Sequence, residues 1–310
     1  MGGSTTPQSA PPARVKAIVA RLDAYERLVR LDKPIGILLL LWPTLSALWL
    51  AALGTPPWSL VLIFTMGTIL MRSAGCAVND WADRRFDPHV KRTAGRPLAA
   101  GEFPPWEALA VAAVLAICAF LLVLGTNRTT ILLSVPGAAI ALVYPFFKRF
   151  FFLPQAFLGI AFSFGIPMAY AAVFDRIPPI AWWLLLLNAF WVIAYDTEYA
   201  MVDRDDDVRL GLRTSAIVFG CFDIAAVLFC YGVYLAGMAA VGIALRMGIA
   251  YYAGLAVALA CAAYHIWLIR RRDRERCFAA FLHNHWLGFA VFAGVVFDFA
   301  LRFRAWPNSL

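Results

Sequence analysis

Two clusters of acidic residues stand out in a chain that is otherwise very apolar. They lie within residues 79–87 and 196–207, and together they hold nine of the nineteen aspartates and glutamates. Each cluster begins where a hydrophobic run ends. Carboxylates crowded at this density repel one another, so the arrangement needs a compensating cation. Carboxylate oxygens suit Mg²⁺, which proteins usually bind together with a phosphate-bearing substrate. The pattern therefore predicts diphosphate chemistry at a membrane surface.

The first cluster has a spacing that could place its polar groups on one helix face. If the preceding helix continues through it, Asn79, Asp83 and Asp87 stack at i, i+4 and i+8, because residues four apart share a face. Asp80 lies beside this stripe, three residues before Asp83. One face would then present an amide and two or three carboxylates, which is a suitable scaffold for a divalent ion.

The second cluster repeats this spacing. Asp203 and Asp207 are four residues apart, and Asp196 lies two turns upstream on a similar helix face. As an alternative, both clusters could be solvated loop charges beside neighbouring arginines. Two clusters at equivalent membrane depth on the same side favour the metal-binding interpretation.

Cations near the clusters could help a diphosphate to bind and to leave. Each of them could equally be an anchor at the cytoplasmic membrane surface. Tyr144 lies one turn before the fourth hydrophobic run ends, where it could line the same cavity. The candidate cations are Lys91, Arg92, Arg96, Lys148, Arg149 and Arg213.

Arg72 is different, because it lies inside an apolar run, seven residues before Asn79. A charge at that depth is costly unless it faces a polar cavity, which makes it a functional candidate. We expect it either to bind the carboxylate of an acidic acceptor or to pair with an intramembrane acid such as Asp223.

Composition places the chain among membrane proteins. Of its 310 residues, 62% are hydrophobic and 15% are charged, and long apolar runs recur at the length of roughly 20 residues that a membrane span needs. We expect about nine transmembrane helices, at residues 35–53, 59–78, 106–125, 130–147, 154–174, 179–195, 214–236, 248–269 and 284–301.

The basic residues indicate how the chain is oriented. With the N-terminus in the cytoplasm, 21 of the 27 lysines and arginines fall on the cytoplasmic side and five on the opposite side. This bias predicts an N-in, C-out topology with both acidic clusters at the cytoplasmic face. The net charge of +8 is therefore a topological signal, and we expect no nucleic-acid partner.

The N-terminal part differs in composition from the rest. Residues 1–13 are rich in Gly, Ser, Thr and Pro and predict a disordered tail. Residues 14–33 have the apolar spacing of an amphipathic helix lying on the cytoplasmic surface. We expect residues 34–310 to form a single transmembrane domain.

The residues resemble the UbiA-type intramembrane prenyltransferases. Two aspartate motifs of that superfamily are similar to the segments 79–87 and 196–207. Longer stretches are similar to the members that prenylate 4-hydroxybenzoate for ubiquinone biosynthesis. These stretches are residues 30–44, 72–80, 89–98, 144–149 and 195–203.

The resemblance implies an all-α membrane protein in which the helices surround a central cavity capped by the aspartate motifs. It implies Mg²⁺-dependent transfer of a polyprenyl group from its diphosphate to the ring carbon ortho to the hydroxyl of 4-hydroxybenzoate. The implied metal ligands are Asn79, Asp83, Asp87, Asp203 and Asp207, and the catalytic residues are Asp83, Asp87, Asp203, Asp207 and Asp196. The expected substrate-binding residues are Arg72, Asn79, Asp80, Tyr144, Lys148, Arg149, Lys91 and Arg92. The expected location is the bacterial inner membrane, in contact with the lipid bilayer, with the active site facing the cytoplasm.

Two alternatives remain open. One is the same superfamily with another aromatic acceptor, such as a naphthoate, homogentisate or haem. The other is a cation-coupled transporter, whose intramembrane acids would bind ions. Against the transporter, nearly all the acids lie near one membrane face.

Overall fold

A computed structural model describes residues 13–147 and 151–305, and within these ranges the chain forms helices and no strand. Most of the helices coincide with the apolar runs of the sequence. Their bounds are α1 Ala13–Leu28, α2 Ile35–Ala51, α3 Trp58–Asp83, η1 Asp87–His89, α4 Pro105–Val123, α5 Arg128–Phe147, α6 Pro154–Ser163, α7 Gly165–Phe174, α8 Pro179–Leu210, α9 Ser215–Val218, η2 Gly220–Phe222, α10 Asp223–Ala244, α11 Ile249–Ile269 and α12 Arg274–Ala305.

The described ranges contain eight helices that are long and apolar enough to cross a membrane, so the chain is a multi-pass membrane protein. One of the eight is the pair α6 and α7, which follow each other from Pro154 to Phe174. The first expected span corresponds to α2, which is apolar but only 17 residues long. The count of nine spans therefore stays a prediction.

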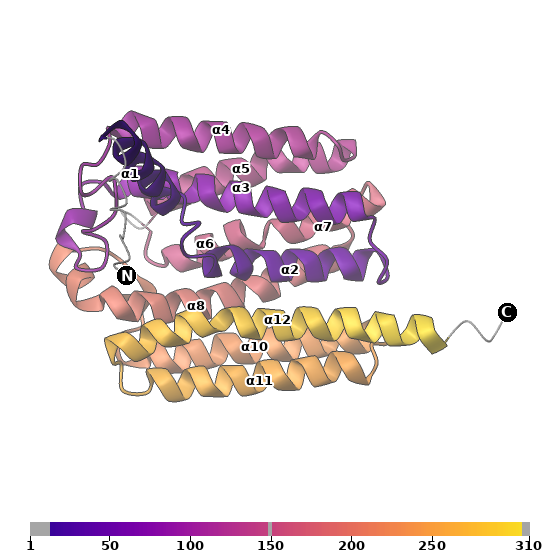
Figure 1. Ribbon diagram of the computed structural model, residues 1–310. Coiled ribbons are helices and arrows are strands. Elements are labelled where there is room, and N and C mark those ends of the chain that lie inside the picture. The colour runs from indigo at the N-terminus through magenta and orange to yellow at the C-terminus, as the bar shows by residue number, and fades with distance from the viewer. Residues whose placement is uncertain (1–12, 148–150, 306–310) are drawn as a thin grey trace, which may run out of the picture.

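The long helices lie side by side in one bundle, and α1 crosses one end of it (Figure 1). The loop between α3 and α4 and the segment after α8 lie at this same end, while α12 ends at the other. Both acidic clusters thus lie at one end of the bundle. That this end faces the cytoplasm remains a prediction from the distribution of basic residues.

Several helix boundaries differ from those expected, and two helix starts are displaced by nine or ten residues. The seventh span was predicted at residues 214–236, but α10 begins only at Asp223, after the short helices α9 and η2. Hydropathy misplaced this start because the residues before it are apolar but form separate short helices. Asp223, the first residue of α10, has a fully buried carboxylate that pairs with Arg204 at 3.1 Å and Arg272 at 2.6 Å. The ninth span was predicted to begin at residue 284, but α12 begins ten residues earlier, at Arg274.

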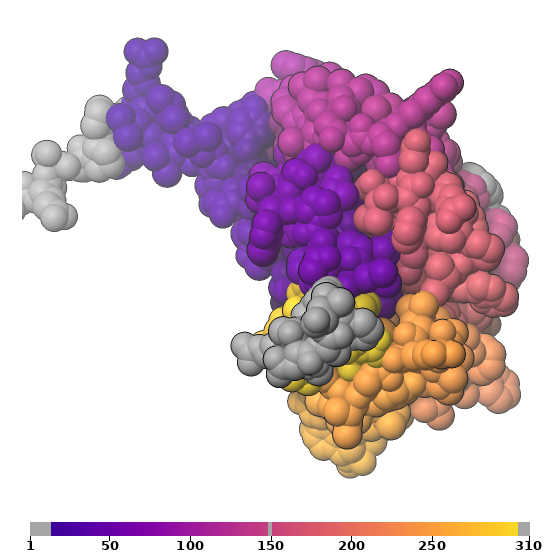
Figure 2. All heavy atoms as spheres, turned by 90° about the vertical axis from the view of Figure 1, so that its right-hand side faces the viewer, coloured from indigo at the N-terminus to yellow at the C-terminus, as the bar shows by residue number. Residues whose placement is uncertain are grey.

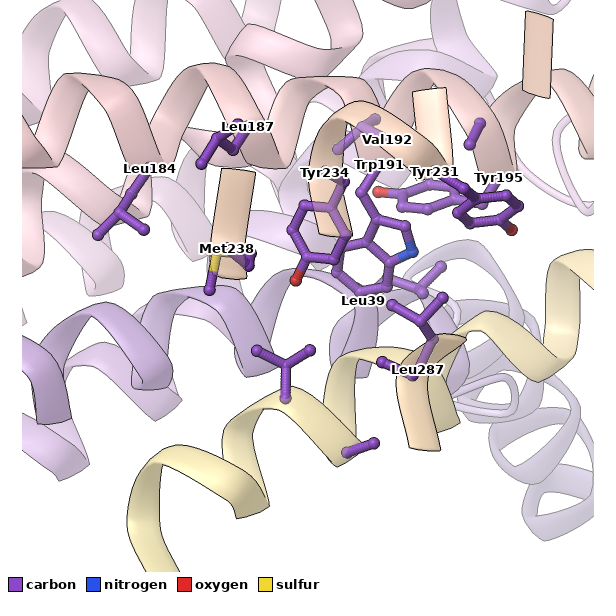
Figure 3. Packing of buried hydrophobic residues seen from close by; sticks show 14 of the residues in the cluster. Leu39, Leu184, Leu187, Trp191, Val192, Tyr195, Tyr231, Tyr234, Met238 and Leu287 are labelled. Carbon is purple, nitrogen blue, oxygen red and sulfur yellow. The ribbon is translucent and has the colours of Figure 1, made fainter. Parts of the chain in front are cut away.

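The core between α8, α10, α12 and α2 is rich in aromatic side chains (Figure 3). Trp191 is fully buried and stacks on Tyr234, with ring centroids 5.6 Å apart. Tyr195 meets the same indole edge-on at 5.4 Å. In lipid the helices gain little from the hydrophobic effect, so such close packing holds them together. The core thereby fixes the position of α8, which carries the second acidic cluster.

A buried polar network adds to this packing. The Tyr231 hydroxyl lies 2.9 Å from Glu198 Oε1, His265 Nδ1 and Asn284 Oδ1. Asn284 Nδ2 donates to Glu198 Oε2 at 2.8 Å, and the Trp191 indole N–H donates to Asn284 Oδ1 at 2.9 Å. These groups come from α8, α10, α11 and α12. Interhelical hydrogen bonds fix the register of helices in a membrane.

A large apolar cavity lies between α2 and α7, with walls from α3, α4, α5 and α6 as well. It encloses about 1210 Å³ of empty space, part of which is open to the outside. Many of its lining residues are small, including Gly67, Gly137 and Ala141, so the helix backbones themselves form much of the wall. The polar side chains Arg72 and Tyr144 also line it.

Candidate active site at the acidic end of the bundle

The first acidic cluster lies at the end of α3, but the helix does not run through it. α3 ends at Asp83, and Asp87 belongs to the separate 3-10 turn η1. The expected helical stripe of Asn79, Asp83 and Asp87 is therefore wrong beyond Asp83. Pro88 gives the reason, because a proline inside a helix lacks the N–H and its ring clashes with the preceding turn.

Asp80 is enclosed by two arginines. Arg30 Nη2 donates to both oxygens of its carboxylate, at 2.9 and 3.1 Å. Arg96 Nη1 lies 3.1 Å from Asp80 Oδ1 and donates to Asp87 Oδ2 at 2.9 Å. Only 1% of the Asp80 side chain is exposed. The Arg96 guanidinium thus holds Asp87 near the end of α3, although Asp87 is not part of that helix.

The second cluster lies on the part of α8 that extends beyond the expected span. The helix continues fifteen residues past the predicted end at residue 195, and Gly211, with φ 67°, caps it in the left-handed region that favours glycine. Asp203 and Asp207 are buried and Asp196 is half-buried. Because the region is one continuous helix, these three carboxylates share a face as the sequence predicted.

Arg92 joins the two clusters. It comes from the loop after the first cluster, and its Nε and Nη2 donate to Asp203 Oδ2 at 2.9 and 2.5 Å. Its guanidinium also lies over the Tyr199 ring, 4.4 Å from the centroid. Lys91 beside it is exposed, and its backbone N–H interacts with the carboxylate of Asp206. The loop between α3 and α4 is therefore held against α8.

Both loop arginines keep their charge in this setting. Burial alone would lower the pKa of Arg96, but the carboxylates of Asp80 and Asp87 raise it above its ordinary value. Burial also acts to lower the pKa of Arg92, while neighbouring Tyr199 and Asp203 raise it. The site thus presents fixed positive charges beside its carboxylates.

Arg72 lines the apolar cavity and lies in the half of α3 that leads to the first acidic cluster. Its Nη1 lies 2.5 Å from Cys76 Sγ, and its guanidinium lies 5.8 Å from the centroid of the Phe162 ring. Its Nε is buried and has no hydrogen-bond partner among the described residues. The alternative partner Asp223 is excluded, because that carboxylate is bound by two other arginines. The Nε of Arg72 is therefore a buried hydrogen-bond donor that no described group satisfies.

Tyr144 connects the cavity with the clusters. It lines the cavity together with Arg72, as the sequence suggested. Its hydroxyl is under the electrostatic influence of Arg72, Asp83 and Asp196, which come from both halves of the site. The expected cations Lys148 and Arg149 lie outside the described residues.

The sequence did not predict the part played by Arg30. This residue lies in the connection between α1 and α2, with φ 59°, and is fifty positions from Asp80. Arg96 was a candidate cation, but its bridge between two aspartates was not foreseen. Neither contact follows from a helical period, and only the fold brings these residues together.

The carboxylates have the donor chemistry that Mg²⁺ prefers. Within the ranges that the structure covers, no three His, Cys, Asp or Glu side chains are grouped as a complete metal site. Mg²⁺ commonly takes one or two carboxylates together with substrate phosphates and water. Asp83 and Asp87 in one cluster and Asp203 and Asp207 in the other are all buried at this end of the bundle.

Comparison with known proteins identifies relatives over almost the whole chain. A model of the UbiA prenyltransferase family matches residues 40–289. The chain is 63% identical to the 4-hydroxybenzoate octaprenyltransferase of Cupriavidus necator, over 92% of this chain and 100% of that protein. It is 62% identical to the enzyme of the same name from Ralstonia nicotianae, over 91% of this chain and 97% of that protein.

Solved structures share the fold. The apo structure of a UbiA homologue from Aeropyrum pernix K1 matches with a TM-score of 0.75 and 26% identity, over 85% of this chain and 97% of that one. A UbiA homologue from Archaeoglobus fulgidus bound to GPP and Mg²⁺ matches with a TM-score of 0.68 and 16% identity, over 87% and 99% of the two chains.

Proposed function

Because the chain belongs to the UbiA prenyltransferase family, we propose that it transfers a polyprenyl group from a polyprenyl diphosphate to 4-hydroxybenzoate. The relatives named for this activity are aligned over more than nine-tenths of the chain. Their name makes an octaprenyl chain the first donor to test. In a pathway this step would supply ubiquinone biosynthesis.

The reaction exchanges one bond for another. The bond between C1 of the prenyl chain and the diphosphate oxygen breaks, and its electron pair leaves with the diphosphate. C1 then bonds to the ring carbon ortho to the hydroxyl of 4-hydroxybenzoate, and that carbon loses its proton. The site must therefore stabilise a leaving diphosphate, orient an aromatic acid and keep water away from an allylic cation.

The two aspartate clusters would hold Mg²⁺ at the mouth of the cavity. When bound, the metal neutralises charge on the departing diphosphate oxygens. The residues that would hold it are Asn79, Asp83 and Asp87 on one side and Asp203 and Asp207 on the other. Asp196 lies two helical turns before Asp203 on α8. Their burial at one end of the bundle and the Arg92 link between the clusters support this assignment.

The loop arginines would orient the clusters and offset the charge of the diphosphate. Arg92 and Arg96 are bound to carboxylates of the clusters, so their guanidinium groups are held at the site. Preorganised cations stabilise charge that develops during a reaction without reorganising. We extend this role to Lys91, and to Lys148 and Arg149, which the sequence places at the end of the fourth span.

The cavity would receive the two organic groups. Its apolar wall of small residues suits a prenyl chain, and it excludes water from the reacting carbon. Arg72 lines the cavity and has an unsatisfied donor, so it would bind the carboxylate of the acceptor, since guanidinium groups bind carboxylates strongly. Tyr144, which lines the cavity beside both clusters, would contact the substrates where they meet.

The location of the enzyme follows from the same reasoning. Bacterial relatives and a multi-pass helical fold support an inner-membrane protein. The excess of lysine and arginine at the acidic end supports a site that opens to the cytoplasm.

The Arg92–Asp203 ion pair is the observation that carries the proposal, because it joins the two segments that bear the carboxylate clusters. The cavity lined by Arg72 and Tyr144 supports the binding of the organic groups. The test is an acceptor panel with purified protein in lipid nanodiscs, octaprenyl diphosphate and Mg²⁺. We expect prenylated product from 4-hydroxybenzoate, and little from a hydroxynaphthoate, homogentisate or 4-hydroxybenzyl alcohol. Faster product formation from another acceptor would keep the prenyl transfer and overturn the choice of 4-hydroxybenzoate.

A further inference from the structure

The helix α1 has two halves with different surroundings. In the C-terminal half, Ala24 and Leu28 are buried in a cluster with α3 and the start of α4. In the N-terminal half, every residue from 14 to 20 is exposed. The exposed half is nevertheless apolar along one side. Ile18 is 53% exposed and Leu22 is 62% exposed, and Val15 and Val19 complete a stripe at i, i+3, i+4 and i+7.

Polar contacts fix the direction in which this half projects. The Tyr25 hydroxyl donates to Glu107 at 2.8 Å, and the Arg27 guanidinium forms two hydrogen bonds to Glu102, at 2.9 and 2.6 Å. Arg21 also pairs with Glu107 and lies over the Phe103 ring. Since α1 is one continuous helix, clamping its second half to the start of α4 sets the position of the first half.

The N-terminal half of α1 projects beyond the bundle, over the place where lipid must lie (Figure 2). Figure 2 shows the indigo segment extending sideways beyond the outline of the bundle. Figure 1 places α1 at the end of the bundle where α3 and α8 end, which is the end that carries the acidic clusters. Lipid surrounds the apolar spans, so a helix that extends sideways at their end lies over the bilayer surface.

The charges beside the stripe fit an anionic surface. Arg14 and Lys16 flank it on either side of the helix, and the same face carries Glu26 one turn after Leu22, where the stripe ends. Apolar residues flanked by basic ones are typical of helices that lie in the headgroup region of a membrane. Basic residues near a membrane surface are attracted to anionic lipids.

We propose that the first half of α1 is a lipid-surface docking element, which inserts Val15, Ile18, Val19 and Leu22 into a bilayer containing anionic phospholipid. Docking would hold α1 in place, and the turn that follows α1 contains Arg30, which donates a hydrogen bond to Asp80. It therefore ties the first aspartate cluster to the membrane surface as well as to the bundle. This inference is independent of the substrate assigned above.

The test uses the full chain in vesicles of phosphatidylcholine, alone or mixed with phosphatidylglycerol. An environment-sensitive NBD label is attached to Ile18→Cys or Leu22→Cys, with Ala17→Cys as the matched control on the opposite, equally exposed side of the helix. The background carries Ala at the accessible cysteines Cys118, Cys221 and Cys261.

We expect a blue-shifted emission at positions 18 and 22, and loss of most of it to lipids brominated on their acyl chains. The label at position 17 should stay unshifted and unquenched. The double variant Arg14→Glu with Lys16→Glu should abolish the extra quenching that phosphatidylglycerol produces.

Equal water exposure at positions 17 and 18 in both kinds of vesicle would overturn the proposal. Disulfide formation between Ile18→Cys copies that depends on protein density, without quenching by lipid, would assign the stripe to a second copy instead. Retained activity of each labelled variant verifies that it is folded, because none of these residues contacts the site.

Discussion

Arg92 and Asp203 form a two-nitrogen ion pair although they are 111 positions apart in the chain. Arg92 follows the first acidic cluster and Asp203 belongs to the second. Both are largely removed from water, and the Arg92 guanidinium also packs on Tyr199. The pair therefore couples the folding of the loop between α3 and α4 to the geometry of the site.

Removing this guanidinium should impair the enzyme strongly. Arg92→Ala leaves the Asp203 carboxylate without its main partner and removes a positive charge from the diphosphate site. We expect kcat/KM for the prenyl diphosphate to fall by about 10²- to 10³-fold, the effect typical of losing one preorganised donor. Arg92→Lys should recover only part of this, because a point charge cannot reproduce the planar fork. A loss below about threefold for Arg92→Ala would contradict the role.

Arg72 should govern the acceptor rather than the donor. Arg72→Ala removes a guanidinium that lines the cavity and whose Nε has no hydrogen-bond partner among the described residues. We expect the KM for 4-hydroxybenzoate to rise by about tenfold or more, since a charge-assisted hydrogen bond contributes about 1.5–3 kcal/mol. The KM for the prenyl diphosphate should change little. The exposed Arg128, at the start of α5, provides the control Arg128→Ala. An equal rise in the KM values for both substrates would contradict the assignment of Arg72 to the acceptor.

Gly36 should be needed to keep Arg72 in place. A Cβ at this position would lie 2.7 Å from Arg72 Nη2 and 2.9 Å from Nε, so the guanidinium would have to move. Gly36→Ala should therefore raise the acceptor KM by about tenfold, equivalent to about 1.4 kcal/mol of binding energy. Gly67→Ala is the matched control, because Gly67 lines the same cavity and a Cβ there meets nothing within 4 Å. The same acceptor KM in Gly36→Ala and Gly67→Ala would contradict the role of Gly36 in positioning Arg72.

Much of the fold could be predicted because membrane spans are encoded locally. α4 and α11 can be recognised from the apolar residues of their own segments alone. Their observed ends lie within two residues of those expected. The start of α10 was misplaced because the apolar residues just before it form the separate short helices α9 and η2. Hydropathy registers that these residues are apolar, but not where one helix ends and the next begins.

The site was predictable in its residue types but not in its assembly. The spacing of Asp196, Asp203 and Asp207 gave their shared face correctly, because α8 is one unbroken helix. The first cluster did not follow helical spacing, because Pro88 prevents α3 from continuing to Asp87. Asp87 is instead held at the site by a hydrogen bond from Arg96. Long-range ion pairs of this kind have no period in the sequence.

The polar network around Tyr231 should stabilise the bundle without taking part in the reaction. Tyr231→Phe removes the hydroxyl that lies between Glu198, His265 and Asn284. We expect the free energy of unfolding to fall by about 0.6 kcal/mol, the average for interhelical hydrogen bonds in membranes, and by at most about 1.7 kcal/mol, with kcat nearly unchanged. Thermal unfolding in detergent measures the change. Tyr264→Phe, at an exposed position in α11, should leave the unfolding temperature where it was.

The most direct test of the central claim is the Mg²⁺ dependence of product formation in the wild type and in two aspartate variants. Purified protein in nanodiscs is given octaprenyl diphosphate and 4-hydroxybenzoate, with a titration of Mg²⁺ or with EDTA. We expect product from the wild type only with the metal, and none from Asp83→Ala or Asp207→Ala, one variant for each cluster, although both fold. Undiminished product in EDTA, or near-normal turnover in either variant, would contradict a reaction carried out between two metal-binding aspartate clusters.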